Sequence, residues 1–168
     1  MALAFIAACN LGIAPETVIT ALKSTPQIAH RLEVKPQENG SILIDDAYNS
    51  NPTGFNSALK LLNTFAQNNR RRILVTPGLV ELGKEHDAEH AKLGKLAAEQ
   101  VDILLAVVPE RIKALTTVFT ANSKPNQQLI LCPTFANARN WLNQNTQPDD
   151  IILLENDLPD VYETKLKL

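Results

Sequence analysis

The chain has 168 residues, of which 45% are hydrophobic and 20% charged, and this balance excludes a disordered tail or a fibrous protein. Its 16 lysines and arginines against 18 acidic residues leave a net charge of −2, so nucleic acid is not an expected partner. A chain of this length accommodates one full domain and a fragment of a second.

The sequence carries no signal for a membrane or for secretion. No apolar run approaches the ~20 residues that span a bilayer, and the apolar start lacks the basic residues of a signal peptide. Cys9 and Cys132 lie far apart and form no CxxC motif, which is typical of buried free thiols in a reducing compartment. We therefore expect a cytoplasmic protein without a membrane span.

Two helical segments come first in the chain. Residues 2–9 are almost all apolar, Gly12 suits the end of a helix, and Pro15 suits the first turn of a second helix that ends near residue 23. Two helices without a strand cannot build a core alone. We therefore expect residues 1–29 to be the last helices of a preceding domain, followed by a linker.

Strand and helix patterns alternate over residues 30–168. Strands are predicted at 31–34 and 41–44, joined by a hairpin turn at Glu38-Asn39-Gly40, and then at 72–76, 102–108, 128–131 and 151–154. Helices are predicted at 53–67, 86–100, 110–121 and 134–144. This alternation predicts an α/β domain with a mainly parallel sheet flanked by helices and preceded by a β-hairpin.

The segment from Gly78 to Lys84 has the GxxxxGK spacing of a phosphate-binding loop between a predicted strand and helix. However, Glu85 stands where such a loop needs a serine or threonine hydroxyl for Mg²⁺, and Glu81 would face an anionic phosphate chain. The interpretation we favour is a strand-to-helix turn that needs glycine dihedral angles.

The segment His86-Asp87-Ala88-Glu89-His90 matches the H-x-x-E-H pattern of some zinc peptidases. A catalytic zinc site needs a third protein ligand, and the only other histidine is His30. Acidic and polar residues are also favoured at a helix start by the helix dipole. We therefore expect an ordinary helix start and no metal site.

The most informative stretch is DDAYNSNP at residues 45–52, where two acids follow an apolar strand and precede a predicted helix. Helix capping explains Asn51 and Pro52, but not two adjacent carboxylates and Tyr48 at the carboxyl edge of the sheet. A carboxylate at this edge can accept hydrogen bonds from ribose hydroxyls. For Arg31, a solvated strand start and a cation that reaches a phosphate held by a preceding domain both remain open.

The combination of Arg31, DDAYNSNP, Glu81-Leu82-Gly83 and His90 resembles the Mur ligase family. The resemblance implies the Rossmann-like, substrate-recruiting C-terminal domain of a three-domain enzyme. Such enzymes are ATP-dependent ligases that activate a carboxylate as an acyl phosphate and then form a peptide bond of a peptidoglycan precursor. Their ATP and Mg²⁺ are bound mainly by the central domain, and their substrates are a UDP-muramoyl peptide and an amine donor.

The resemblance also implies site residues in this chain. Arg31 would be catalytic and reach the ATP phosphates, Asp46 would hold the ribose hydroxyls, and Asn49 would be a further polar residue beside the nucleotide. Asn51 and Glu81 would face the cleft where a dipeptide such as D-alanyl-D-alanine enters. No residue is assigned as a metal ligand.

Two points stay open from the sequence. Many relatives have a small basic loop after the last strand, whereas residues 155–159 are acidic here, so another amine donor remains open. The chain could also be a stand-alone α/β ligand-binding or interaction module without catalysis. In either case we expect a monomer that is inactive by itself, because it lacks a complete phosphate-binding loop.

Overall fold

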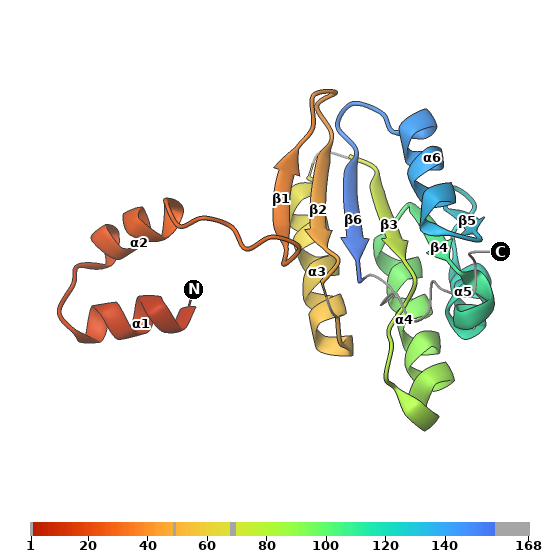
Figure 1. Ribbon diagram of the computed structural model, residues 1–168, viewed down its shortest axis with the longest axis horizontal. Coiled ribbons are helices and arrows are strands. Elements are labelled where there is room, and N and C mark those ends of the chain that lie inside the picture. The colour runs from red at the N-terminus through yellow and green to blue at the C-terminus, as the bar shows by residue number, and fades with distance from the viewer. Residues whose placement is uncertain (1, 49, 68–69, 157–168) are drawn as a thin grey trace.

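The computed structural model describes residues 2–48, 50–67 and 70–156, and their helices and strands form an α/β body preceded by a helical pair (Figure 1). The helices are α1 (Ala2–Asn10), α2 (Pro15–Lys23), α3 (Pro52–Phe65), α4 (His86–Gln100), α5 (Lys113–Asn122) and α6 (Phe135–Asn145). The strands are β1 (Glu33–Pro36), β2 (Ile42–Asp46), β3 (Arg72–Thr76), β4 (Ile103–Val107), β5 (Gln128–Cys132) and β6 (Ile151–Glu155). Short 3₁₀ turns, η1 (Gly83–Glu85) and η2 (Pro109–Ile112), precede α4 and α5.

The strands form one six-stranded sheet in the order β1-β2-β6-β3-β4-β5. β1 pairs with β2 in antiparallel fashion, and all other neighbouring strands are parallel. The predicted α/β class, the mainly parallel sheet and the initial hairpin are therefore confirmed. β6, the last strand in the chain, lies between β2 and β3, so the carboxyl ends of these three strands are neighbours.

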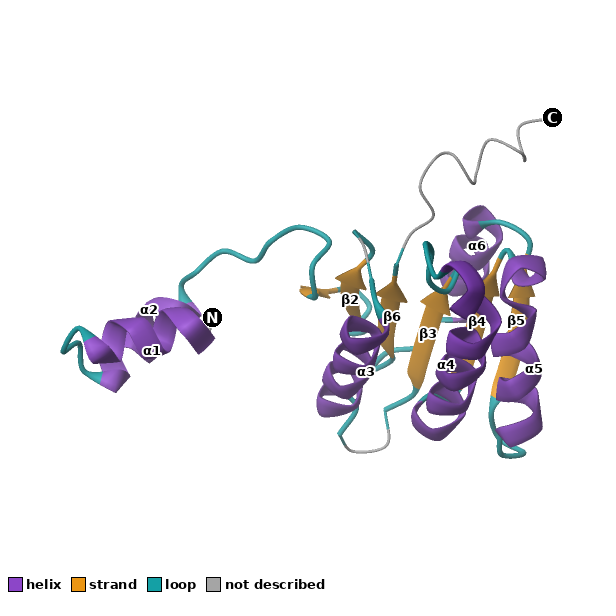
Figure 2. Ribbon diagram, turned by 90° about the horizontal axis from the view of Figure 1, so that it is seen from below, coloured by secondary structure: helices purple, strands orange, loops and turns teal. Residues whose placement is uncertain are grey.

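Helices cover both faces of this sheet. α3, α4 and α5 lie on one face and α6 on the other (Figure 2). In β3, Leu74 packs toward the three helices, whereas Ile73 and Val75 pack with α6, because successive strand residues point to opposite faces. Burial on both faces explains why the parallel strands read as continuous apolar runs.

The predicted first strand is displaced by two residues from the observed one. β1 begins at Glu33 because His30 and Leu32 have positive φ angles of 58° and 49°, which turn the chain sharply around Arg31. Arg31 therefore lies in a turn before the strand. Likewise, the first turn of the helix predicted at 110–121 is the 3₁₀ turn η2.

α1 and α2 pack against each other and stand apart from the α/β body, to which residues 24–32 connect them (Figure 1). Leu3 and Leu11 on this pair are each 83% exposed, and they are two of several large apolar side chains that the pair exposes. No helix in the described part of the chain is long and apolar enough to cross a membrane. Both cysteines are free, and Cys132 is buried whereas Cys9 is only half-buried.

Candidate functional site

Arg31 and Tyr48 meet at the carboxyl end of β2. The guanidinium carbon of Arg31 lies 4.2 Å from the centre of the Tyr48 ring, and both side chains are exposed. The turn that carries Arg31 is also tied to this strand end by the backbone N–H of Tyr48, which donates to the carbonyl of His30 at 3.2 Å. A cation and an aromatic face are thus presented together to solvent beside the sheet.

Asp46 holds the other side of this turn. One oxygen of its half-buried carboxylate accepts the backbone N–H of Leu32 at 3.0 Å. Burial raises the pKa of Asp46 above its ordinary value, although the Leu32 hydrogen bond and the charge of Arg31 oppose the rise. The turn that carries Arg31 is therefore tied to the Asp46 carboxylate through Leu32, and the charge of Arg31 acts on that carboxylate.

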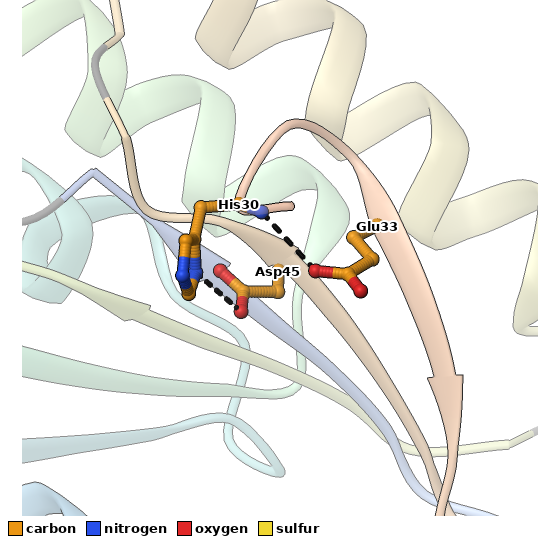
Figure 3. A group of neighbouring side chains, drawn as sticks. All are labelled: His30, Glu33 and Asp45. Carbon is orange, nitrogen blue, oxygen red and sulfur yellow. Dashed lines mark hydrogen bonds and ion pairs between the residues drawn. The ribbon is translucent and has the colours of Figure 1, made fainter. Parts of the chain in front are cut away.

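Asp45 points to the opposite face and belongs to a different cluster, drawn with His30 and Glu33 in Figure 3. Its Oδ2 accepts from Nζ of Lys35 at 2.7 Å and lies 3.0 Å from Nδ1 of His30. Burial opposes ionisation of Asp45, but these two partners outweigh it and leave the pKa below its usual value.

The ligand atoms of His30, Glu33 and Asp45 lie within 4.8 Å of one another, a spacing that could suit a metal ion. Nζ of Lys35 sits 2.9 Å from Glu33 and 2.7 Å from Asp45, so an ammonium group already occupies the position between the two carboxylates. We therefore assign this cluster a structural role, which is to anchor β1 and the preceding turn to β2.

Both histidines of the H-x-x-E-H pattern form hydrogen bonds with backbone groups. His90 is completely buried, its Nδ1 donates to the carbonyl of His86 at 2.7 Å, and its Nε2 accepts the N–H of Leu79 at 3.0 Å. Nε2 of His86 lies 2.8 Å from the carbonyl of Arg111. Burial lowers the pKa of His90 to about 4, so the ring is neutral and stabilises the loop after β3.

This arrangement also explains the glycines of the GxxxxGK segment. Gly78 has a φ of +73°, and a Cβ there would lie 2.3 Å from Nε2 of His90. Gly83 also has a positive φ, 53°, where the chain enters η1. The segment is a strand-to-helix turn against a buried histidine, which is the interpretation that the sequence favours.

The remaining predicted site residues are not gathered at Arg31 and Asp46. Oδ1 of Asn51 accepts the N–H of Gly54 at 2.9 Å and so caps α3, which is the helix-capping role weighed for it. Glu81 is exposed in the loop after β3, with a φ of 61°. Asn49 lies outside the residues that the structure describes.

Glu155 and Asn156 form a part of this region that the sequence patterns do not reveal. Both are buried, which the acidic loop expected at residues 155–159 does not indicate; residues 157–159 lie outside the described part. The N–H of Asn156 donates to the carbonyl of Asp46 at 3.1 Å, and its side-chain amide donates to the carbonyl of Gly78 at 2.7 Å. Asn156 therefore joins the carboxyl ends of β2, β6 and β3.

Comparison with known proteins assigns this chain to a family. Residues 30–155 match the family model described as "Mur ligase, glutamate ligase domain". The chain belongs to the Mur ligase family. The match covers the α/β body, including Arg31, both aspartates of the DDAYNSNP stretch, and Glu155.

Individual Mur ligases support the same placement. The chain is 35% identical over 105 residues to UDP-N-acetylmuramoyl-tripeptide--D-alanyl-D-alanine ligase of Mycobacterium tuberculosis, covering 60% of this chain and 20% of that protein. The protein of the same name from Mycobacterium leprae is 27% identical over 159 residues, which is 86% of this chain and 31% of that protein.

Solved structures of MurF resemble the chain closely in fold. MurF from Acinetobacter baumannii aligns with a TM-score of 0.65 and 27% identity, over 95% of this chain and 33% of that one. MurF from Thermotoga maritima, solved with ADP, has the same fold with a TM-score of 0.64 and 19% identity, over 86% of this chain and 33% of that one. The chain thus corresponds to a fifth to a third of these Mur ligases, at their C-terminal domain.

Proposed function

We propose that the chain is the substrate-recruiting C-terminal domain of an ATP-dependent ligase of peptidoglycan precursor synthesis. This ligase adds D-alanyl-D-alanine to a UDP-muramoyl peptide through an acyl phosphate. The names of the Mycobacterium relatives support this substrate pair. The single observation that carries the proposal is the joint placement of Arg31 and Asp46 at the carboxyl edge of the sheet, where ligands bind in open α/β folds.

We assign residues 1–29 to the end of the central ATPase domain and its linker. α1 and α2 expose large apolar side chains, and such surfaces need a partner. The family match begins only at residue 30, just before β1. In the complete ligase the remainder of the ATPase domain would cover these helices.

In this proposal the chain supplies side chains that hold the nucleotide, and the central domain supplies the phosphate-binding loop. Arg31 is exposed, so it can turn from Tyr48 toward the phosphates, where its cation would stabilise charge that develops in the transition state. Asp46 has acceptor positions beyond the one used by Leu32 and can accept from ribose hydroxyls. Closure of this domain would then shield the acyl phosphate from water.

The other assignments follow from position in the chain. Asn49 would lie beside the nucleotide, and Asn51 and Glu81 would lie beside the entering dipeptide. ATP fits the donor and acceptor set formed by Arg31 and Asp46. Mg²⁺ would be held mainly by the central domain. In this chain the carboxylate of Asp45 already contacts Lys35 and His30.

The proposal is tested by steady-state kinetics of the complete ligase that contains this chain. Asp46→Ala should raise the KM for ATP roughly 10- to 150-fold, since a hydrogen bond to a charged group contributes about 1.5–3 kcal/mol. Arg31→Ala should instead lower kcat. Asp45→Asn serves as the matched control, because it alters the adjacent carboxylate on the opposite face. An unchanged KM in Asp46→Ala, with a raised KM in Asp45→Asn, would overturn the assignment.

A second test uses the 168-residue chain alone. It should show no ATP hydrolysis, because Lys84 lies in the exposed turn η1 and the phosphate-binding loop belongs to another domain. Hydrolysis by a purified sample that disappears in Lys84→Ala would support a phosphate-binding role for the GxxxxGK segment instead. It would also favour a free-standing enzyme over a recruiting domain.

A further inference from the structure

Glu155, the last residue of β6, is a completely buried carboxyl group with an incomplete set of partners. Its Oε1 accepts the hydroxyl proton of Ser50, a residue 105 positions earlier in the chain. Its Oε2 is also buried and receives no hydrogen bond from a donor among the described residues. An ionised carboxylate in this state would lose its hydration with a single neutral hydrogen bond in return.

The neighbour of Glu155 makes ionisation still less favourable. Asp46 is its register partner on β2, so both side chains leave the sheet on the same face at adjacent strand ends. Burial raises the pKa of Glu155 to about 8, and the charge of Asp46 adds to this effect, whereas the Ser50 hydrogen bond opposes it. The charged groups that act on Asp46 in turn are Arg31 from the turn before β1 and Asp45 on β2.

Protonation of Glu155 removes both unfavourable effects, the buried charge and its repulsion from Asp46. Its O–H group is a donor, and the adjacent Asp46 is an acceptor whose other oxygen binds Leu32. We propose that Glu155 is a positioning residue that stays protonated at neutral pH, shares its proton with Asp46 and, through Ser50, holds the carboxyl end of β2 in its nucleotide-binding arrangement. This role rests on the proposed binding of ATP by Asp46.

The proposal has a consequence for nucleotide affinity. Loss of the Glu155 proton would place a second negative charge beside Asp46 and remove the hydrogen bond between the two groups. If only the protonated form binds ATP, the apparent KM rises as the protonated fraction falls, which is about tenfold between pH 7 and pH 9. Glu155 itself does not touch the nucleotide, so kcat at saturating ATP should keep its pH profile.

The protonation state of Glu155 is measured directly on the wild-type 168-residue chain by ¹³C NMR of the glutamate side-chain carboxyls. The Glu155 signal should titrate with a midpoint near pH 8, and the midpoint should fall by about one unit or more in Asp46→Asn. Asp149→Asn, at an exposed position before the opposite end of β6, is the control and should leave the midpoint in place. A midpoint below about pH 6, or one indifferent to Asp46→Asn, would overturn the shared proton.

The positioning role is tested in the complete ligase with Glu155→Gln. Glutamine keeps the neutral shape, so its amide can donate to Asp46 and its carbonyl can accept from Ser50. The variant should show the wild-type KM for ATP at pH 7, without the rise toward pH 9. Glu155→Ala should show a raised KM for ATP at both pH values. A rise with pH in Glu155→Gln equal to that of the wild type would refute the positioning role. If instead Asp46→Ala leaves the KM unchanged while the NMR midpoint is near 8, the shared proton stands and the ATP role of Asp46 fails.

Discussion

The guanidinium of Arg31 rests on the ring of Tyr48 with 4.2 Å between the guanidinium carbon and the ring centre. Both groups are exposed, so this cation–π contact contributes only about 0.5–1 kcal/mol. Such a weak contact can order a side chain without trapping it. It gives Arg31 a defined resting place beside Asp46 in the free protein.

Replacing Tyr48 should therefore change the order of Arg31 more than the stability of the fold. In Tyr48→Ala, the ¹⁵N–¹H NOE of the Arg31 Nε–H group should fall toward the value of a freely moving side chain, whereas Tyr48→Phe should retain it. The free energy of unfolding should change by less than about 1 kcal/mol in both variants. Equal order of Arg31 in Tyr48→Ala and the wild type would mean that the backbone turn alone positions this residue.

Asp45 should contribute more to stability than its neighbour Glu33, although both contact Lys35. Asp45→Asn weakens contacts with Lys35 and His30 at a buried position, so we expect a loss of about 1–3 kcal/mol in urea denaturation. Glu33→Gln, at a more exposed position, should lose clearly less, because solvent screens its ion pair with Lys35. Because the pKa of Asp45 is lowered by folding, its contribution is present above the unfolded pKa and is lost as the pH falls through the folded pKa. Equal losses in the two variants would contradict this ranking.

Gly78 should tolerate a methyl group poorly. A Cβ there would approach Nε2 of His90 to 2.3 Å and Cγ2 of Ile112 to 2.7 Å, in addition to the cost of the left-handed backbone. Gly40→Ala is the matched control, since its φ is +89° and nothing lies within 4 Å of the added Cβ. We expect about 1 kcal/mol for Gly40→Ala and at least about 3 kcal/mol for Gly78→Ala, measured as free energies of unfolding. Similar values for both would show that His90 does not press against the loop.

The regular part of the fold could be predicted because its signals are local. The helix predicted at 86–100 coincides with α4, and the apolar runs at 72–76 and 151–154 identify β3 and most of β6. Asp45 and Asp46 face opposite sides, an arrangement that follows from the two-residue period of a strand alone.

The site is less predictable because it depends on distant segments. The left-handed turn at His30 and Leu32 has no glycine, and it is held by Asp46 and Tyr48, which lie at least 14 residues away. Glu155 is buried because β6 inserts between β2 and β3, and strand order is not encoded in any local pattern. From the sequence alone, a carboxyl group at the end of an apolar strand therefore looks like the start of the acidic loop that follows it.

His90 and Glu155 give the protein two opposite dependences of stability on pH. The folded pKa of His90, about 4, is below its unfolded value of 6.5, so its contribution is present above pH 6.5 and is lost as the pH falls toward 4. The folded pKa of Glu155, about 8, is above its unfolded value of 4.5, so its contribution is present below pH 4.5 and is lost as the pH rises toward 8. Because a tenfold change in a proton-binding constant corresponds to about 1.36 kcal/mol, these two contributions amount to roughly 3 and 5 kcal/mol respectively.

The two contributions should be separable by measuring the free energy of unfolding from pH 4 to pH 9. Between about pH 4.5 and 6.5 the rise from His90 and the fall from Glu155 nearly cancel, and above 6.5 only the fall remains. Glu155→Gln, which carries no titratable proton, should keep the rise from pH 4 to 6.5 and lose the fall toward pH 8. The variant should therefore be more stable than the wild type at pH 8, by several kcal/mol. The difference between the two curves of unfolding free energy against pH isolates Glu155. If the wild-type curve falls no more steeply than that of the variant above pH 6.5, Glu155 ionises with its ordinary pKa in the folded protein.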